Sequence, residues 1–362
     1  MPFSIVQNDI ARIQADAIVN PANPKPVVGA GTDAAIHAAA GPQLLAAREQ
    51  IGVIRCGSCA VTPAFGLDAR YVIHTVGPVW HGGAFGEARK LRRCYDEALR
   101  QAAELDCESV AFPLLSTGTY GFPKEKGLRI ALDAFRDFLQ IHEMNILLVV
   151  WDRESVRLSE QLHSVVEKYV DEHYVAQQTR KEYGLRPSFS ARRRRAEAMQ
   201  EADTDACDTA APFPDAAPCG APCASAAPVV SNASALSAEP TLSELLRHTD
   251  AGFSETVLKL IDRSGRKDAE VYRRANLSRQ HFSKIRSNPD YRPTKPTALA
   301  LAIALELDLE QTKDLIGRAG YALTNSSKFD VIVSYFISKK HYDLFEINAA
   351  LFEFDQVTLG AS

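Results

Sequence analysis

Two side-chain amides and a carboxylate stand close together in the stretch from Asn20 to Gly41. Asn20 and Asn23 precede a turn of small residues, Gly29-Ala30-Gly31, which runs through Thr32 into Asp33 and the helix-like run AAIHAAA. Without Cβ atoms, the two glycines let the backbone approach a ligand, and successive N–H groups ahead of a helix supply partial positive charge. This segment therefore has the chemistry to hold a diphosphate without a basic side chain.

Other interpretations of the same stretch stay open at this point. Asp33 also fits a helix N-cap, and the glycines also fit a tight turn between a strand and a helix. The run GAGTDA matches the dinucleotide pattern G-x-G-x-x-A, but that pattern needs a strand directly before its first glycine. Because Pro21, Pro24 and Pro26 cannot donate to a strand ladder, we expect a loop there, and a nicotinamide cofactor is disfavoured.

A second small-residue loop follows the apolar run SVAFPLL and reads Ser116-Thr117-Gly118-Thr119-Tyr120-Gly121. Alone it would fit an ordinary connection that ends at Pro123 in the first turn of a helix. Two such loops could instead grip a ligand with two phosphates from both sides through backbone amides.

The two loops together resemble the ligand loops of macrodomains. The first resembles the family pattern N-A-A-N, a glycine run and V-D-x-x-I-H, with Asn23 and Asp33 at matching spacing, although Pro21 and Ala30 depart from it. The second matches S-T-G-x-Y-G-x-P. The resemblance covers roughly the first 170 residues and implies a mixed sheet between helices, with the ligand cleft at the loops that leave the strand ends.

Further segments agree with this family. Asn8-Asp9-Ile10 resembles the G-D-I motif whose carboxylate accepts a hydrogen bond from adenine, and Trp151 stands where macrodomains often carry an aromatic residue at the adenine. His74 falls in a core-strand motif, so we expect a packed residue and not a catalyst. The residues that the resemblance assigns to ADP-ribose binding are Asp9, Ile10, Asn20, Gly29, Ala30, Gly31, Thr32, Ser116, Thr117, Gly118, Thr119, Tyr120, Gly121 and Trp151.

The resemblance implies either a reader of ADP-ribose or a hydrolase that removes it. In a hydrolase, Asn23 would hold the distal ribose, Asp33 would orient or activate a water near the anomeric carbon, and Tyr120 would pack beside the ribose. His37 is expected to be a plain helix-face residue. Because Asn23 and Asp33 are both present, we expect removal of mono-ADP-ribose from acidic side chains of a protein, or hydrolysis of related ADP-ribose esters. No metal or other cofactor is required; the alternative is a non-catalytic ADP-ribose sensor that acts as a transcriptional regulator.

Composition limits the remaining choices. The chain has 362 residues, of which 46% are apolar and 24% charged, and this composition favours two domains with sizeable cores. Its net charge of −4 does not indicate a particular class of binding partner. No apolar run is long enough to span a bilayer, and the N-terminus lacks a secretory signal. The seven cysteines form no disulfide or zinc-site pattern in an ordered segment. We therefore expect a cytoplasmic protein with reduced thiols and no membrane partner.

The predicted architecture has three parts. In residues 1–175, the macrodomain, we predict strands over Ala17 to Asn20, Tyr71 to Val76, Ser109 to Leu115 and Ile146 to Trp151. Helical periodicity covers Glu87 to Leu105 and Glu125 to Ile141, which indicates an α/β fold in three layers. Residues 176–240 hold the basic cluster Arg192 to Arg195 and then an Ala/Pro-rich stretch, which favours a flexible linker.

Residues 241–362 are predicted to form a separate, all-helical domain. Ser254 is the expected cap of its first helix, and residues 268–287 resemble the helix-turn-helix of lambda-repressor-like domains, in which Ser278 caps a helix that buries Phe282 and Ile285. In that fold the second helix enters the major groove of DNA. Its exposed reading face would consist of Arg279, Gln280, His281 and Lys284.

Charge along the helical domain supports contact with a polyanion. Between Lys259 and Lys295 there are eleven Lys and Arg against four Asp and Glu, whereas Glu306 to Asp355 holds five against nine. A basic stripe on a helix-turn-helix is the footprint of phosphate contacts. DNA is therefore a predicted partner, and a helical interaction module is the alternative. The chain also contains two closing apolar segments, residues 326–341 and 343–354, which would either pack back on the helix-turn-helix or form a homodimer surface.

Overall fold

The computed structural model describes residues 2–156, 162–171 and 251–360. The predicted linker at 176–240, including Arg192 to Arg195, lies outside these residues. Among the described helices, none is both long and apolar enough to cross a membrane.

The N-terminal region is built on a six-stranded mixed sheet with the strand order β1-β6-β5-β2-β4-β3. Every neighbouring pair is parallel except β3 with β4, which is antiparallel. The strands are β1 (Phe3–Gln7), β2 (Ala17–Pro21), β3 (Cys59–Pro63), β4 (Tyr71–Thr75), β5 (Ser109–Phe112) and β6 (Asn145–Val150). The four predicted strands are present, whereas the two edge strands, β1 and β3, were not predicted.

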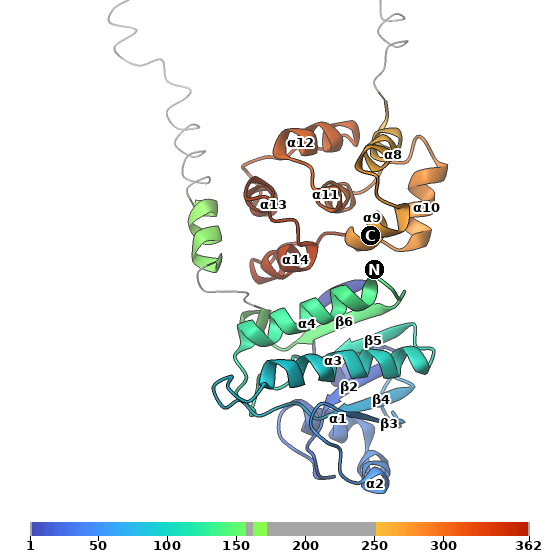
Figure 1. Ribbon diagram of the computed structural model, residues 1–362, viewed down its shortest axis with the longest axis vertical. Helices are drawn as coiled ribbons and strands as arrows, with labels where there is room; N and C mark the ends of the chain where they lie inside the picture. The colour runs from blue at the N-terminus through green and yellow to red at the C-terminus, as the bar shows by residue number, and fades with distance from the viewer. Residues whose placement is uncertain (1, 157–161, 172–250, 361–362) are drawn as a thin grey trace, which may run out of the picture. The chain divides into compact units, whose positions relative to one another are not determined.

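Helices cover both faces of this sheet (Figure 1). They are α1 (Thr32–Ala40), α2 (Pro42–Ile51), α3 (Glu87–Glu104) and α4 (Lys124–Leu139), with the short 3-10 helices η1 (Ile10–Arg12) and η2 (Arg153–Val156). Because side chains alternate along a strand, Ala17 and Val19 of β2 join one apolar core with α3 and α4, whereas Ile18 joins the other core with α1 and α2. The predicted three-layer α/β arrangement is confirmed.

The C-terminal region is helical, as predicted. Its helices are α8 (Phe253–Ser264), α9 (Asp268–Arg274), α10 (Arg279–Ser287), α11 (Lys295–Ala304), α12 (Leu309–Arg318), α13 (Lys328–Ser338) and α14 (Leu344–Glu353). Helix α11 lies at the centre of its apolar core, with Leu299, Leu301 and Ile303 fully buried. The closing helices α13 and α14 join this core, and α14 also contacts the α/β region.

Helices α9 and α10 lie in the segment that was predicted as a helix-turn-helix, and the helix before them needs one correction. The Ser278 side chain accepts a hydrogen bond from the N–H of His281 at 3.2 Å, and Phe282 and Ile285 are buried. Ser254, however, is not a helix cap. The buried Phe253 begins α8, Gly252 occupies the N-cap position, and Ser254 lies buried in the first turn.

The helical region packs against the α/β region within one compact unit. Asn276, in the turn between α9 and α10, is fully buried. Its side-chain oxygen accepts from the N–H of Phe3, and its amide donates to the carbonyl of Phe3, both at 2.8 Å. Since β1 is an edge strand, this amide satisfies backbone groups that would otherwise lack partners.

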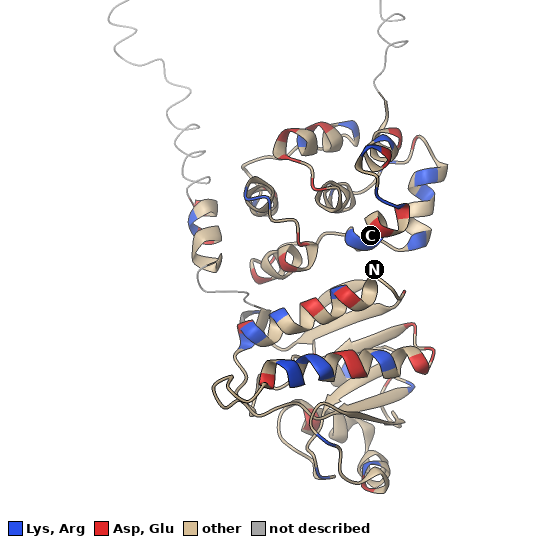
Figure 2. Ribbon diagram, viewed as in Figure 1, with Lys and Arg blue, Asp and Glu red and all other residues tan. Residues whose placement is uncertain are grey.

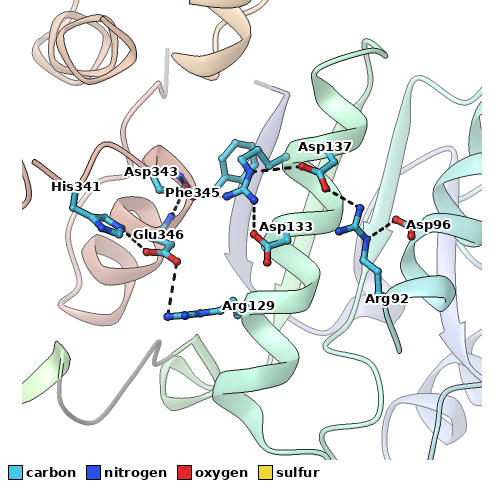
Figure 3. A network of polar contacts seen from close by, with 10 residues as sticks. Arg92, Asp96, Arg129, Asp133, Asp137, His341, Asp343, Phe345 and Glu346 are labelled. Atoms are coloured by element: carbon cyan, nitrogen blue, oxygen red, sulfur yellow. Dashed lines mark hydrogen bonds and ion pairs between the residues drawn. The ribbon is translucent and has the colours of Figure 1, made fainter. Parts of the chain in front are cut away.

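Helix α14 makes the second part of this contact. Its Phe345 ring stacks on the Phe3 ring with centroids 4.7 Å apart. Asp343 pairs with Arg136 of α4 at 2.5 Å, and Glu346 lies 4.0 Å from Arg129. Figure 3 shows the Glu346 carboxylate directed toward Arg129. An apolar stack and a buried amide thus hold the two regions together, and ion pairs surround them.

We predict that Asn276→Gly lowers the free energy of unfolding by about 2 to 4 kcal/mol, because two backbone groups of Phe3 lose their buried partner. Glycine readily adopts the positive φ of 55° at this position, so backbone strain does not contribute to the change in the free energy of unfolding. Urea unfolding of the full chain measures the change, with the exposed Asn325→Gly as the control. Equal midpoints for Asn276→Gly and the wild type would contradict the role of this amide.

Candidate functional site

The Asp33 carboxylate lies at the carboxyl end of β2, in the first turn of α1, and is 4% exposed. Asn20 Nδ2 donates to its Oδ1 at 2.6 Å, and the N–H of Gly29 donates to its Oδ2 at 2.5 Å. His37 Nε2, one helical turn further on, lies 3.5 Å from Oδ1. These contacts fix the carboxylate in one orientation and leave it the capacity to accept another hydrogen bond.

A buried polar chain lies behind Asn20. Asn20 Nδ2 lies 3.1 Å from His74 Nδ1, and His74 Nε2 lies 3.0 Å from Thr62 Oγ1 on the edge strand β3. Burial, and then the charges of Arg48 and His37, lower the pKa of His74 to about 3. The imidazole is therefore neutral at physiological pH, and its Nδ1 accepts from the Asn20 amide. His74 is a packed strand residue, as expected, and it also orients Asn20.

Arg48 of α2 holds the loop that carries Asn23, a function that the sequence did not reveal. Its side chain is 2% exposed, and its guanidinium donates to the carbonyls of Asn23 and Pro24 at 3.2 Å and also to the carbonyl of Gly52. A buried arginine with carbonyl partners fixes the backbone of the loop. A helical arginine is ordinarily exposed, so only the structure identifies it.

Asn23 connects the two ligand loops. Tyr120 Oη donates to its Oδ1 at 3.2 Å, and its Nδ2 donates to the carbonyl of Val27 at 3.0 Å. A Cβ at Gly29 would lie 2.9 Å from Asn23 Nδ2 and 3.1 Å from Asp33 Oδ2. Glycine is therefore needed at position 29 because the two predicted catalytic side chains approach the backbone there.

The small-residue turns have the local geometry that the sequence implied. Gly31 has φ of +67° and precedes the N-terminus of α1, whereas Ala30 is not among the described residues with positive φ, so the family departure at Ala30 does not strain the turn. In the second loop, Ser116 has φ of 63°, and a Cβ at Gly77 would lie only 2.0 Å from its Oγ. The N–H of Gly121 donates to the carbonyl of Gly118 at 2.9 Å.

The two loops enclose a cavity of about 220 Å³. The predicted site residues that line it are Asn23, Gly29, Ala30, Gly31, Thr32, Asp33, Ser116, Gly118, Thr119 and Tyr120. Asn20 lies behind Asp33, and Thr117 donates to the carbonyl of Leu114 at 3.1 Å. Within the described residues, no group of three His, Cys, Asp or Glu side chains is arranged to hold a metal ion.

The predicted adenine residues lie outside this cavity, at the ends of two neighbouring strands. Asp9 follows β1 and caps η1 by accepting from the N–H of Ala11 at 3.0 Å, and Ile10 is buried beneath it. Trp151 follows β6, and its side chain is 77% exposed. Because β1 and β6 are adjacent and parallel, Asp9 and Trp151 leave the same edge of the sheet.

The predicted reading face of α10 is only partly free. Arg279, Gln280 and Lys284 are exposed, but His281 is half-buried and lies 2.7 Å from the Tyr291 hydroxyl. Arg279 and Gln280 also line a cleft of about 670 Å³ together with Glu143 of the α/β region.

Comparison with known proteins identifies relatives of the N-terminal region. Residues 19–131 match the family model described as Macro domain. Macro domain-containing protein CT2219 of Chlorobaculum tepidum is 47% identical over 134 residues, which cover 37% of this chain and 78% of that protein. An O-acetyl-ADP-ribose deacetylase of Salmonella newport is 42% identical over 162 residues, which cover 43% of this chain and 90% of that protein. The chain belongs to the Macro domain family.

Solved structures are also similar. The Oceanobacillus iheyensis macrodomain with ADP is 35% identical, and the match has a TM-score of 0.42 and covers 46% of this chain and 92% of that one. Residues 251–360 lie outside the part of the chain that the family model matches.

We predict that the stability of this protein falls on acidification partly through His74. Its folded pKa of about 3 lies below an unfolded value near 6.5. The stability contributed by the neutral ring is therefore fully present above about pH 6.5 and is lost progressively toward pH 3. At pH 5 the loss is about 2 kcal/mol, from 1.36 kcal/mol per pKa unit.

The variant His74→Asn keeps an acceptor near Asn20 but does not titrate. Urea unfolding at pH 7.5 and pH 5 should show a smaller difference for this variant than for the wild type, by about 2 kcal/mol. The exposed His81→Asn serves as the control and should keep the wild-type difference. The same pH dependence in His74→Asn and the wild type would contradict the assignment.

Proposed function

We propose that this chain binds ADP-ribose between its two small-residue loops and hydrolyses the bond between the distal ribose and a carboxyl group. The substrates would be proteins mono-ADP-ribosylated on acidic side chains, or related ADP-ribose esters. The observation that carries the proposal is the Asp33 carboxylate, which is held by Asn20 and Gly29 at the wall of the cavity. The relatives named O-acetyl-ADP-ribose deacetylase support hydrolysis as the reaction class.

The diphosphate would lie between the two loops. Backbone N–H groups at the N-terminus of α1 and in the turn from Ser116 to Gly121 can donate to its oxygens, and the α1 dipole favours negative charge there. Gly31 supplies the left-handed conformation that ends the first loop. This grip needs no cation, which agrees with a cavity whose lining residues include no lysine or arginine.

The hydrolytic step would use Asp33 and Asn23 in different ways. Water adds to the anomeric carbon of the distal ribose as the bond to the leaving carboxylate oxygen breaks. Asp33 accepts a hydrogen bond from this water and takes its proton, which then passes to solvent. The anomeric carbon becomes electron-poor in the transition state, so the negative charges of Asp33 and the diphosphate stabilise it.

Asn23 would orient the ribose. Its amide is already fixed by Tyr120 on one side and by the carbonyl of Val27 on the other. A side chain that is held before the ligand arrives loses little conformational entropy on binding, and it keeps the anomeric carbon aligned with the water.

We predict that Asp33→Ala and Asn23→Ala each lower kcat/KM at least about tenfold, roughly 1.4 kcal/mol of transition-state stabilisation. The assay measures free ADP-ribose released from a protein mono-ADP-ribosylated on carboxylates and, separately, hydrolysis of O-acetyl-ADP-ribose. Asp68→Ala, which removes an exposed carboxylate elsewhere in the same region, should retain wild-type rates.

Calorimetric binding of ADP-ribose separates the alternatives. Binding by the wild type without release from either substrate would reject the hydrolase and leave the sensor as the function. Absence of binding and release would reject both.

DNA binding by α10 is a second candidate function, favoured by five cations of the segment from Lys259 to Lys295. These are Arg263, Lys267, Arg279, Lys284 and Arg292, and none has a carboxylate partner among the described ion pairs. The Lys and Arg of α10 appear in blue in Figure 2. Five of the other six cations pair with carboxylates within the protein, which reduces the basic footprint seen in the sequence.

If α10 contacts DNA phosphates, Arg279→Ala combined with Lys284→Ala should weaken binding to a mixed-sequence duplex and lower the salt-dependence slope by about 2. Fluorescence anisotropy of a labelled duplex at several salt concentrations measures both quantities. Lys313→Ala on α12, whose side chain pairs with Glu310, is the control. A duplex affinity that is unmeasurable at low salt in the wild type would reject this candidate.

A further inference from the structure

Helix α14 contacts three elements of the α/β region that also position the predicted adenine end of the site. Phe345 stacks on Phe3 of β1, and Asp343 pairs with Arg136 of α4. Val156 of η2, the short helix that follows Trp151, is fully buried in the apolar cluster that includes Phe345 and Ala349 of α14. Helix α14 also packs directly against η2.

A polar chain extends from the helical region to the backbone of Trp151. Asp355, two residues beyond α14, lies 2.7 Å from Arg153 Nη2. Arg153 Nε donates to Gln7 Oε1 at 3.2 Å, and Gln7 Nε2 donates to the carbonyl of Trp151 at 3.2 Å. The segments that follow β1 and β6 are thus tied to each other and to the end of the helical region.

Two buried asparagines fix α14 and the chain after it in place. Asn348 of α14 accepts from the N–H of Leu359 at 2.6 Å and donates to its carbonyl at 3.1 Å. The next residue, Gly360, packs so closely on the backbone of Asn276 that a Cβ would lie 3.1 Å from its carbonyl oxygen. Asn276 in turn holds Phe3. These contacts leave α14 little freedom to move relative to β1.

We propose that the C-terminal helical region positions the adenine end of the ADP-ribose site, with α14 and Asp355 as its contact elements. The inference rests on the proposed function, because it presumes that adenine binds beside Asp9 and Trp151. Trp151 is 77% exposed, so its ring gains order mainly from the backbone that carries it. The helical region orders that backbone and reduces the conformational entropy lost on binding.

The reacting end of the site does not depend on this contact. Asp33 is held by Asn20, Gly29 and His37, all of which belong to the α/β region. Loosening α14 should therefore weaken ligand affinity and leave the chemical step unchanged, a pattern that general loss of folded protein would not produce.

The experiment uses the full chain with Asp355→Asn and Asn276→Gly. Asparagine removes the charge and tolerates the positive φ of 61° at position 355. Calorimetry measures the Kd for ADP-ribose and for ADP, and steady-state assays give KM and kcat. We expect Kd and KM to rise about threefold in Asp355→Asn, in keeping with an exposed ion pair. In Asn276→Gly the rise should be about tenfold or more, and kcat should stay within about twofold in both variants.

The Kd for ADP shows which end of the ligand a substitution affects. ADP carries the adenine and the diphosphate but no distal ribose, so a disturbance at the adenine end weakens ADP as much as ADP-ribose. Because exposed charges are screened by salt, the difference between Asp355→Asn and the wild type should shrink at about 0.5 M salt. Asp314→Asn, which removes the charge of an exposed ion-paired carboxylate on α12, is the matched control and should equal the wild type.

Unchanged Kd and KM in Asn276→Gly, or a loss confined to kcat, would overturn this inference and leave the proposed function intact. Failure of the wild type to bind ADP-ribose or ADP would instead overturn the proposed function, and this inference with it. Asp355→Asn keeps the test valid if Asn276→Gly is poorly folded, because the Asp355 side chain is 73% exposed and asparagine tolerates its positive φ.

Discussion

The hydrogen bonds that fix Asp33 are the constraint on which the candidate site depends. A carboxylate that is almost fully buried is costly unless donors satisfy it, and here Asn20 and the backbone of Gly29 do so. His74 accepts a hydrogen bond from the same Asn20 amide, and the neutral state of His74 follows from its burial in the sheet. The geometry around Asp33 is thus set by the interior of the fold.

The same principle operates at the contact between the two folded regions. An amide side chain completes an edge strand by matching the N–H and the carbonyl of one residue, Phe3. The two hydrogen bonds are directional and fix which residue of β1 is contacted. The ring stack beside them buries apolar surface but does not select one residue as strictly. Together they explain how a helical region that follows a long intervening segment packs at one place on the sheet.

Much of the fold could be predicted from the sequence, and the reasons differ from element to element. The central strands β2, β4, β5 and β6 are short apolar runs between turn residues, a pattern that persists whatever surrounds them. The edge strand β3 is mostly half-buried, so its apolar signal is weak. On the outer edge of strand β1, the backbone groups of Phe3 are satisfied by Asn276, which is distant in sequence.

In the candidate site, too, some features could be predicted from the sequence and others depend on tertiary contacts. Asn23, Asp33 and the two glycine turns could be predicted because their residue types and spacing carry the signal. The contribution of Arg48 could not, because burying its guanidinium depends on carbonyls that α2 meets only in the folded chain. Asn276 fits a turn residue in the sequence, and its positive φ agrees with that interpretation. Its second function, holding Phe3, requires the tertiary structure.

A crystal structure of the full chain with ADP-ribose bound would show whether the distal ribose reaches Asp33. We expect the diphosphate to lie between residues 29–33 and 116–121, with the anomeric carbon of the distal ribose facing Asp33. Adenine should then lie beside Asp9 and Trp151. A ligand bound in the reverse direction, or in a cleft beside the helical region, would rule out attack at the anomeric carbon with the help of Asp33.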